Sequence, residues 1–107
     1  MAHYLWQIAY SSDGWAALVK NPQNRIDAIR PAVEKLGGKI ESGWFAFGEY
    51  DIVSIVQFPD NVSAAAFAIA VAAAGSVKSF KTTPLLSVAE GVEALKKASG
   101  SGYKRAT

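Results

Sequence analysis

Four stretches of the chain have the pattern of hydrophobic residues that is typical of strands. They are rich in aromatic and β-branched residues, and they span residues 3–10, 39–47, 50–58 and 77–85. Only Gly48 and Glu49 separate the two middle stretches, which is the length of a tight hairpin turn. Glycine at the first central position is typical of a type II′ turn, so the pattern predicts a hairpin there.

Between the first two strands, the apolar positions follow the three-to-four-residue spacing of helices. Residues 11–14 (SSDG) supply capping side chains for a first helix. Asn21 and Pro22 interrupt it, and the sequence predicts that this pair opens a second helix with Asn21 as its cap. Pro31 is expected to kink the second helix, and glycines 37 and 38 are expected to end it.

Two more helices are predicted in the second half of the chain. Pro59-Asp60-Asn61 caps one at about 61–74, and Ser87 and Glu90 form a capping box that opens another, ending near residue 98. The resulting order is β-α-β-β-α-β with an extra C-terminal helix. This order predicts an α+β, ferredoxin-like domain whose four-stranded antiparallel sheet carries both main helices on one face. We expect one domain over residues 1–98 and a flexible tail over 99–107.

Apolar side chains occupy both faces of the predicted strands, whereas a strand with one wet face should alternate apolar and polar residues. Strict alternation places Tyr4, Trp6, Ile8 and Tyr10 opposite Leu5 and Ala9; Ile40, Trp44 and Ala46 opposite Phe45 and Phe47; and Tyr50, Ile52, Val56 and Phe58 opposite Val53 and Ile55. Helices can cover only one face of the sheet. We therefore expect the other face to meet that of a second copy in a homodimer.

The predicted helix at 61–74 carries no charged residue and no polar stripe. A helix that is apolar all round is usually buried all round. Two arrangements would bury this one. Its own sheet and the terminal helix could cover it, or it could form a second contact between copies.

Composition narrows the classes of function. The chain has 107 residues, a net charge of +2, no cysteine and one histidine, His3. Because the chain has no cysteine, it cannot bind a metal through cysteine or use a thiolate as a nucleophile. With one histidine, it cannot form a metal site of two histidines within one chain. No cofactor motif is present. No basic stripe supports nucleic-acid binding. The N-terminus does not resemble a signal peptide, and no apolar run is long enough for a membrane span, so a cytoplasmic protein is expected.

The stretch that contains Gly48, Tyr50 and Asp51 resembles the Gly-Tyr-Asp motif of the GYD domain family. The resemblance covers nearly all of residues 3–86. It implies a fold of the dimeric α/β-barrel type, in agreement with the predicted elements and pairing. It assigns no catalytic residue.

Five residues are candidates for ligand binding: Tyr4, Trp6, Trp44, Tyr50 and Asp51. The four aromatic side chains could wall an apolar pocket with hydroxyl and indole donors, or they could form the core of a dimer. Tyr50 and Asp51 should leave the turn on opposite faces. Asp51 could bond to the backbone near the hairpin, or it could pair with Arg25 or Arg30.

These features favour a homo-oligomeric domain that binds a small, partly apolar molecule or serves as an assembly module. The alternative is a small cofactor-independent enzyme of the monooxygenase or isomerase type, acting on an aromatic or quinone-like substrate, although this rests on fold analogy. A ligand-sensing regulator is a third possibility. It would need a partner, because no DNA-binding helix pair is present.

Overall fold

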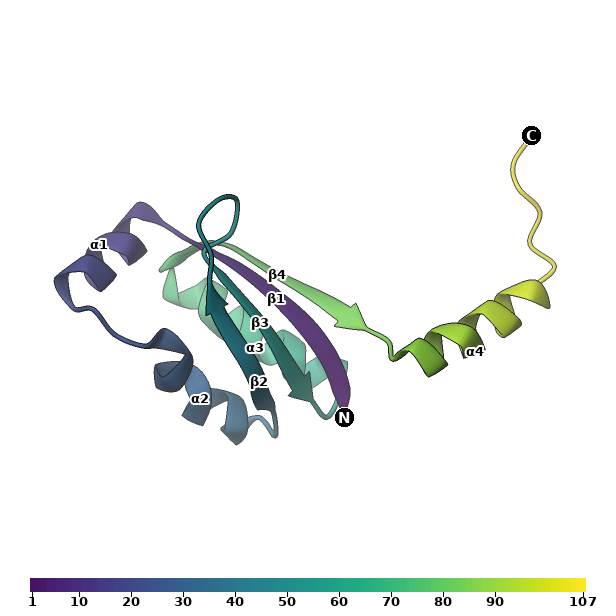
Figure 1. Ribbon diagram of the computed structural model, residues 1–107, viewed down its shortest axis with the longest axis horizontal. Coiled ribbons are helices and arrows are strands. Elements are labelled where there is room, and N and C mark those ends of the chain that lie inside the picture. Colours follow the sequence, from purple (N-terminus) through teal and green to yellow (C-terminus); the bar gives the residue numbers. More distant parts are fainter.

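A computed structural model describes residues 1–107 (Figure 1). Its strands are β1 (Ala2–Tyr10), β2 (Lys39–Phe45), β3 (Ile52–Phe58) and β4 (Val77–Leu85). Its helices are α1 (Ser12–Lys20), α2 (Arg25–Lys35), α3 (Asn61–Ala74) and α4 (Val88–Ser99). The strands form one antiparallel sheet in the order β2-β3-β1-β4. This order and the helices confirm the predicted α+β, ferredoxin-like fold.

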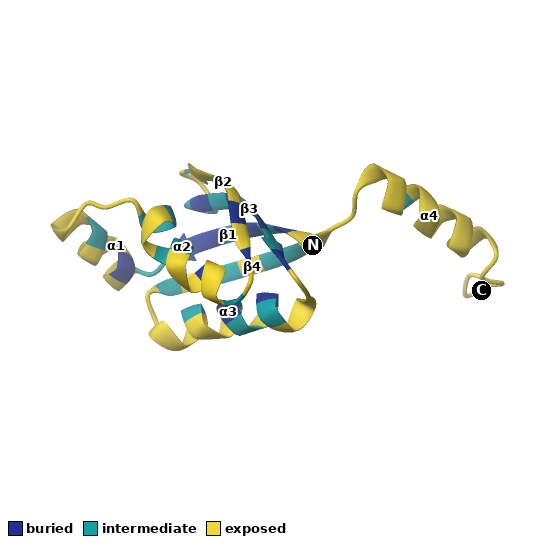
Figure 2. Ribbon diagram, turned by 90° about the horizontal axis from the view of Figure 1, so that it is seen from below, coloured by how far each residue is buried: buried dark blue, intermediate teal, exposed yellow.

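One face of the sheet is covered and the other is bare. Helix α2 packs against β2, and helix α3 packs against β3 and β4. Helix α1 lies at the end of β1. All three helices lie on the same side of the sheet, as the edge-on view shows (Figure 2). No helix has the length and hydropathy needed to span a membrane.

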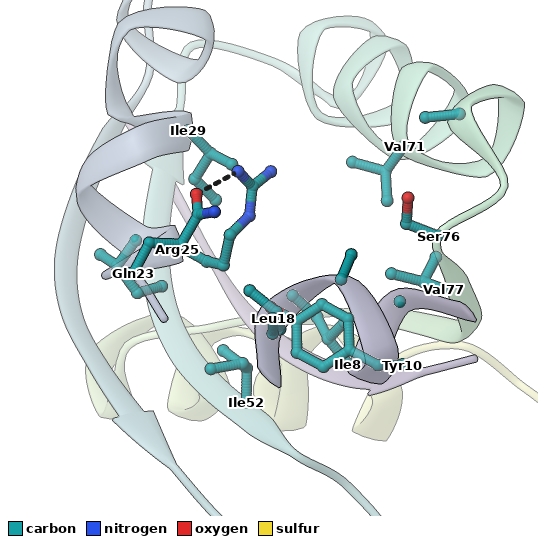
Figure 3. Close-up of a pocket in the computed structure, with 14 residues that line it drawn as sticks. Ile8, Tyr10, Leu18, Gln23, Arg25, Ile29, Ile52, Val71, Ser76 and Val77 are labelled. Atoms are coloured by element: carbon teal, nitrogen blue, oxygen red, sulfur yellow. Dashed lines mark hydrogen bonds between the residues drawn. The ribbon is translucent and has the colours of Figure 1, made fainter. Parts of the chain in front are cut away.

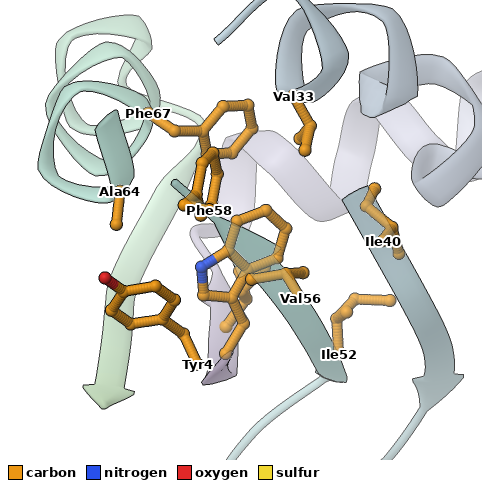
Figure 4. Close-up of a cluster of buried hydrophobic side chains, with 10 residues drawn as sticks. Tyr4, Val33, Ile40, Ile52, Val56, Phe58, Ala64 and Phe67 are labelled. Carbon is orange, nitrogen blue, oxygen red and sulfur yellow. The ribbon is translucent and has the colours of Figure 1, made fainter. Parts of the chain in front are cut away.

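The core lies between the sheet and helices α2 and α3 (Figure 4). Trp6 is fully buried and stacks on Phe67 of α3, with 5.0 Å between the ring centroids. Tyr4 meets Phe58 edge-on, and its hydroxyl donates a hydrogen bond of 2.6 Å to Oδ1 of Asn61, the first residue of α3. These aromatic contacts fix α3 on the sheet.

Helix α2 begins later than the sequence predicts. Asn24, not Asn21, is its N-cap, and the Asn24 side chain accepts a hydrogen bond of 3.1 Å from the backbone of Asp27. Asn21 instead ends α1, where its N–H donates to the carbonyl of Ala17. The prediction for Asn21 and Pro22 was wrong because Asn24 offers a second cap just downstream, which leaves Pro22 outside both helices.

The connection between β2 and β3 is a loop over residues 46–51 rather than a two-residue turn. Gly48 has a φ of 155°, a backbone conformation that favours glycine, but a type II′ turn needs about +60° at its first central position. The type II′ prediction was therefore wrong. Asp51 bonds to both neighbours of β3: its N–H donates to the carbonyl of Ile8 at 2.7 Å, and its carbonyl accepts from the N–H of Ala46 at 2.8 Å.

A β-bulge in β2 reverses the predicted faces of that strand. Ile40 pairs with Val56, but Ser42 pairs with Ile55, so Glu41 is the extra residue. Beyond the bulge, Trp44 pairs with Val53 and lies on the bare face, whereas strict alternation had placed it with Ile40. That prediction was wrong because it assumed an uninterrupted ladder.

Helix α4 projects beyond the end of β4 and lies far from α3 in both views (Figures 1 and 2). The molecule consequently measures 56 × 34 × 23 Å. The sheet side of α3 buries Ala64 and Phe67. In one of the two arrangements expected from the sequence, the sheet and the terminal helix of the same chain together cover α3. The terminal helix does not cover the other side of α3, so this prediction was wrong within one chain.

Candidate functional site

A half-enclosed cavity of about 260 Å³ lies where α1, α2 and α3 meet the sheet (Figure 3). Most of its lining is apolar, which is typical of sites for small organic molecules. The lining residues are Ile8, Tyr10, Gly14, Ala17, Leu18, Gln23, Arg25, Ile26, Ile29, Ile52, Val71, Ala74, Ser76 and Val77. We refer to this cavity as the three-helix pocket.

The wall formed by α1 depends on a close backbone contact. The Ser11 side chain caps α1 by accepting from the N–H of Gly14 at 3.1 Å, and it donates to the carbonyl of Ser76 at 3.1 Å. A Cβ at position 14 would lie 2.2 Å from that same carbonyl oxygen. Glycine is thus required where α1 meets the segment between α3 and β4.

Four polar side chains line the otherwise apolar pocket: Tyr10, Gln23, Arg25 and Ser76. Arg25 is the first residue of α2, and it donates a hydrogen bond of 3.0 Å to Oε1 of Gln23 (Figure 3). Burial raises the pKa of Tyr10 above its usual 10.0; the Arg25 guanidinium opposes this rise, and the Asp51 carboxylate adds to it. At neutral pH the Tyr10 hydroxyl therefore keeps its proton and can donate a hydrogen bond.

Asp51 stands next to this pocket as a backbone anchor. Its carboxylate accepts a hydrogen bond of 2.9 Å from the N–H of Tyr10. It forms no ion pair with Arg25 or Arg30, and Arg30 instead pairs with Asp27 at 3.4 Å. The prediction of a helix cation for Asp51 was wrong, because the carboxylate has a backbone donor in β1 as its partner.

The structure does not bring the predicted aromatic candidates together in one wall. Tyr4 and Trp6 belong to the core beneath α3. Trp44 is 69% exposed on the bare face, and Tyr50 lies half-buried in the loop between β2 and β3. Neither these four residues nor Asp51 line the three-helix pocket, and a ligand contact at any of them stays a prediction.

The sequence reasoning missed Tyr10 and Arg25 as a pair. A signal was available for Tyr10, because strict alternation places it on the same face as Tyr4, Trp6 and Ile8, which is the covered face. No comparable signal exists for Arg25. Its position depends on where α2 begins, and the sequence placed that start too early.

A second, more polar groove of about 580 Å³ runs between α2 and the edge strand β2. Its lining includes Arg30, Glu41 and Trp44, and it shares Gln23, Arg25 and other residues with the three-helix pocket. Arg25 therefore stands between the pocket and the groove. No group of three or more His, Asp or Glu side chains is arranged to hold a metal ion.

The bare face of the sheet combines apolar side chains with polar ones, which include Gln7 and Lys81 in the row of Val53 and a cluster at one end. Leu5, Val53 and Ile55 lie half-buried on it beside the exposed Trp44. At its polar end, Glu41 bonds to His3 at 3.2 Å and accepts a hydrogen bond from Gln57. Apolar side chains of this kind, left open in one chain, are typical of a contact surface.

Comparison with known proteins places the chain in one family. The model of the GYD domain matches residues 4–95. A curated relative from Thermus thermophilus is 32% identical over 87 residues, which is 80% of this chain and 90% of that protein. The relative is named glutamine synthetase and cystathionine beta-lyase binding protein. No solved structure matches. With the Gly48, Tyr50 and Asp51 motif in place, the chain belongs to the GYD domain family.

Proposed function

We propose that this chain is a homo-oligomeric binding domain that takes a small, partly apolar molecule into the three-helix pocket. The observation that carries this proposal is the presence of Tyr10 and Arg25 together in the lining of a mainly apolar pocket. A few polar groups in an apolar cleft fix the orientation of a ligand and select its chemistry. The volume is below the roughly 300–1,000 Å³ of typical ligand sites, which favours a compact ligand.

Tyr10 and Arg25 indicate which ligand chemistry fits the pocket. Arg25 presents a permanent positive charge, and the Tyr10 hydroxyl keeps its proton, so both are donors at neutral pH. A ligand with an apolar body and one carboxylate would satisfy both groups. Charge-assisted hydrogen bonds of this type are among the stronger polar contacts in proteins.

Native mass spectrometry of the purified protein would reveal a bound molecule directly. Titration can follow the tryptophan fluorescence, because one of the three tryptophans, Trp15, has its ring 5.1 Å from that of Tyr10. We expect benzoate to change this fluorescence in the wild type and to lose affinity in Arg25→Gln. Arg30→Gln is the matched control, since Arg30 belongs to the same helix but does not line the pocket. Equal weakening in both variants would contradict the proposal.

The homo-oligomeric part of the proposal rests on the bare face of the sheet. Pairing two such faces would cover Leu5, Val53 and Ile55 together with Trp44, and a symmetric dimer uses the same patch twice. Sedimentation at micromolar concentration tests it. A stable monomer would contradict this part and leave the pocket proposal standing.

A second candidate function is docking to another protein. The relative from Thermus thermophilus is named for binding two enzymes, and the same bare face could serve a foreign partner. Co-migration of this chain with purified glutamine synthetase on a sizing column would support this candidate. If instead the bare face is closed by a second copy, Trp44→Ala should weaken self-association and leave binding to glutamine synthetase unchanged.

The enzymatic alternative, a cofactor-independent monooxygenase or isomerase, has less support in the pocket. Catalysis of those types needs a group able to take a proton near neutral pH. The raised pKa of Tyr10 makes it a donor there and a poor base. This property favours binding over proton abstraction by Tyr10.

A further inference from the structure

Helix α4 is well formed but has no buried residue. Both hydrogen bonds of its capping box are present: Ser87 Oγ accepts from the N–H of Glu90 at 3.1 Å, and Glu90 accepts from the N–H of Ser87 at 2.9 Å. A single helix of this length is only marginally stable in water, and most helices in proteins are stabilised by packing. Something outside this chain's own body is therefore needed to cover α4.

The exposed apolar side chains of α4 form one stripe. Val88, Val92 and Leu95 are spaced four and three residues apart, and they are 87%, 44% and 70% exposed. This is the spacing of the seam between two packed helices. The charged residues Glu90, Glu93 and Lys97 lie on the other side of the helix.

The outward side of α3 carries a seam of the same kind. Val62, Ala65, Ile69 and Ala72 follow a three-four-three spacing, and all four are exposed. Val62 and Ile69 are 79% and 68% exposed. Large and small residues alternate along this seam, so the larger side chains of another helix can settle over its alanines. α3 contains no charged residue that would oppose such a contact.

We propose that α4 of one chain packs its stripe onto the outward seam of α3 in a second copy. The occupant is a second copy for two reasons. Both unpartnered seams have heptad-like spacing and belong to the same sequence, so a reciprocal exchange covers each of them. Only Leu86 and Ser87 connect β4 to α4, and α4 leaves the sheet away from its own α3 (Figure 2). Exchange of an identical element between copies is a low-cost route to assembly.

This contact is separate from the pairing of sheet faces. α3 lies on the covered side of the sheet, whereas the proposed sheet pairing uses the bare side (Figure 2). The two contacts can therefore join different copies, and together they would build an assembly larger than a dimer. The inference stands whether or not the three-helix pocket binds a ligand.

Cysteine crosslinking tests the contact cleanly, because the chain has no cysteine of its own. The full-length double variant Ile69→Cys/Val92→Cys is oxidised and run on a non-reducing gel. We expect a covalent species of twice the mass or more, with the 69–92 disulfide identified by mass spectrometry. The matched control replaces Glu93 instead of Val92, which turns the cysteine by about 100° around α4, and it should remain uncrosslinked.

Three results would overturn the proposal. A disulfide that forms at monomer mass would show that α4 folds back onto its own α3. Equal crosslinking of Val92→Cys alone would show that two α4 helices pair with each other. No crosslink, with both thiols reactive towards a labelling reagent, would show that position 92 of α4 does not pack against position 69 of α3. Circular dichroism of each variant confirms that the domain is folded.

Discussion

The carboxylate of Asp51 accepts a hydrogen bond of 2.9 Å from the backbone N–H of Tyr10, so the last residue of the β2–β3 loop is attached to the end of β1. Tyr10 itself lines the three-helix pocket. The loop that carries the Gly48, Tyr50 and Asp51 motif is thereby connected to two lining residues of the candidate site, because the Asp51 N–H also donates to the carbonyl of Ile8 at 2.7 Å. This gives Asp51 a structural role that does not require contact with a ligand.

Asp51→Ala should therefore destabilise the domain. The change leaves the N–H of Tyr10 without its partner, and hydrogen bonds to charged groups contribute about 1.5–3 kcal/mol. Urea denaturation would measure the loss of free energy of unfolding. Glu49→Ala is the control, since Glu49 is exposed in the same loop and should change stability by less than about 0.5 kcal/mol. Equal effects of the two changes would contradict the anchoring role.

Gly14→Ala should cost stability and distort the three-helix pocket. The added Cβ would lie 2.2 Å from the carbonyl oxygen of Ser76, so α1 must move away from the segment it contacts. Overpacking of this kind costs about 1–3 kcal/mol. Gly91→Ala is the comparison, because nothing lies within 4 Å of that position. It should leave the melting temperature of the sheet domain unchanged, and a melt in which both variants match the wild type would refute the close contact.

The order of elements was predictable from the chain because each element has its own local signal. The charge-free run at 61–74 became α3, and the capping box at Ser87 and Glu90 opened α4 as expected. These signals depend on residues close in sequence. Local hydrogen bonds and periodic apolar positions decide them without reference to the rest of the fold.

The faces and the site were harder to predict because they depend on contacts between distant segments. One extra residue, Glu41, moves Trp44 from the covered to the bare face, and a pattern of alternation contains no sign of it. Similarly, Arg25 lines the same pocket as Tyr10 as the first residue of α2, and Asn24 sets that start of the helix. Where a side chain's position depends on a bulge or on long-range packing, it can be determined only from the folded structure.

The exposed position of Trp44 alters the expected effect of removing it. Within one chain Trp44 is 69% exposed, so Trp44→Ala should leave the unfolding of a dilute monomer nearly unchanged. If two bare faces pair, the same change should weaken association by about 2–4 kcal/mol, as removal of a buried aromatic anchor does. Sedimentation over a range of concentrations measures this difference. Phe47→Ala, a fully exposed loop position, is the control and should not shift the association.

Acid should loosen the start of α4. The hydrogen bond from the N–H of Ser87 holds the pKa of Glu90 below its usual 4.5. A lowered pKa in the folded state means that the cap stabilises the helix above pH 4.5 and that this contribution is lost as the pH falls through the folded pKa. Amide chemical shifts of Ser87 and Glu90 would follow the loss. Glu90→Gln keeps an acceptor at this position and should remove the pH dependence.

The Tyr10 hydroxyl should contribute measurably to ligand affinity if the three-helix pocket is the binding site. Tyr10→Phe removes one donor and leaves the apolar wall in place, so benzoate should bind about tenfold more weakly, the equivalent of roughly 1.4 kcal/mol. Because burial raises the pKa of Tyr10 above 10.0, the wild type should keep this advantage throughout the neutral range. Isothermal titration at pH 7 and pH 9 measures both effects. Tyr103→Phe, in the exposed C-terminal segment, controls for the loss of a phenol elsewhere. If Tyr10→Phe binds benzoate as tightly as Tyr103→Phe does, the hydroxyl faces no ligand and the proposed polar end of the pocket is wrong.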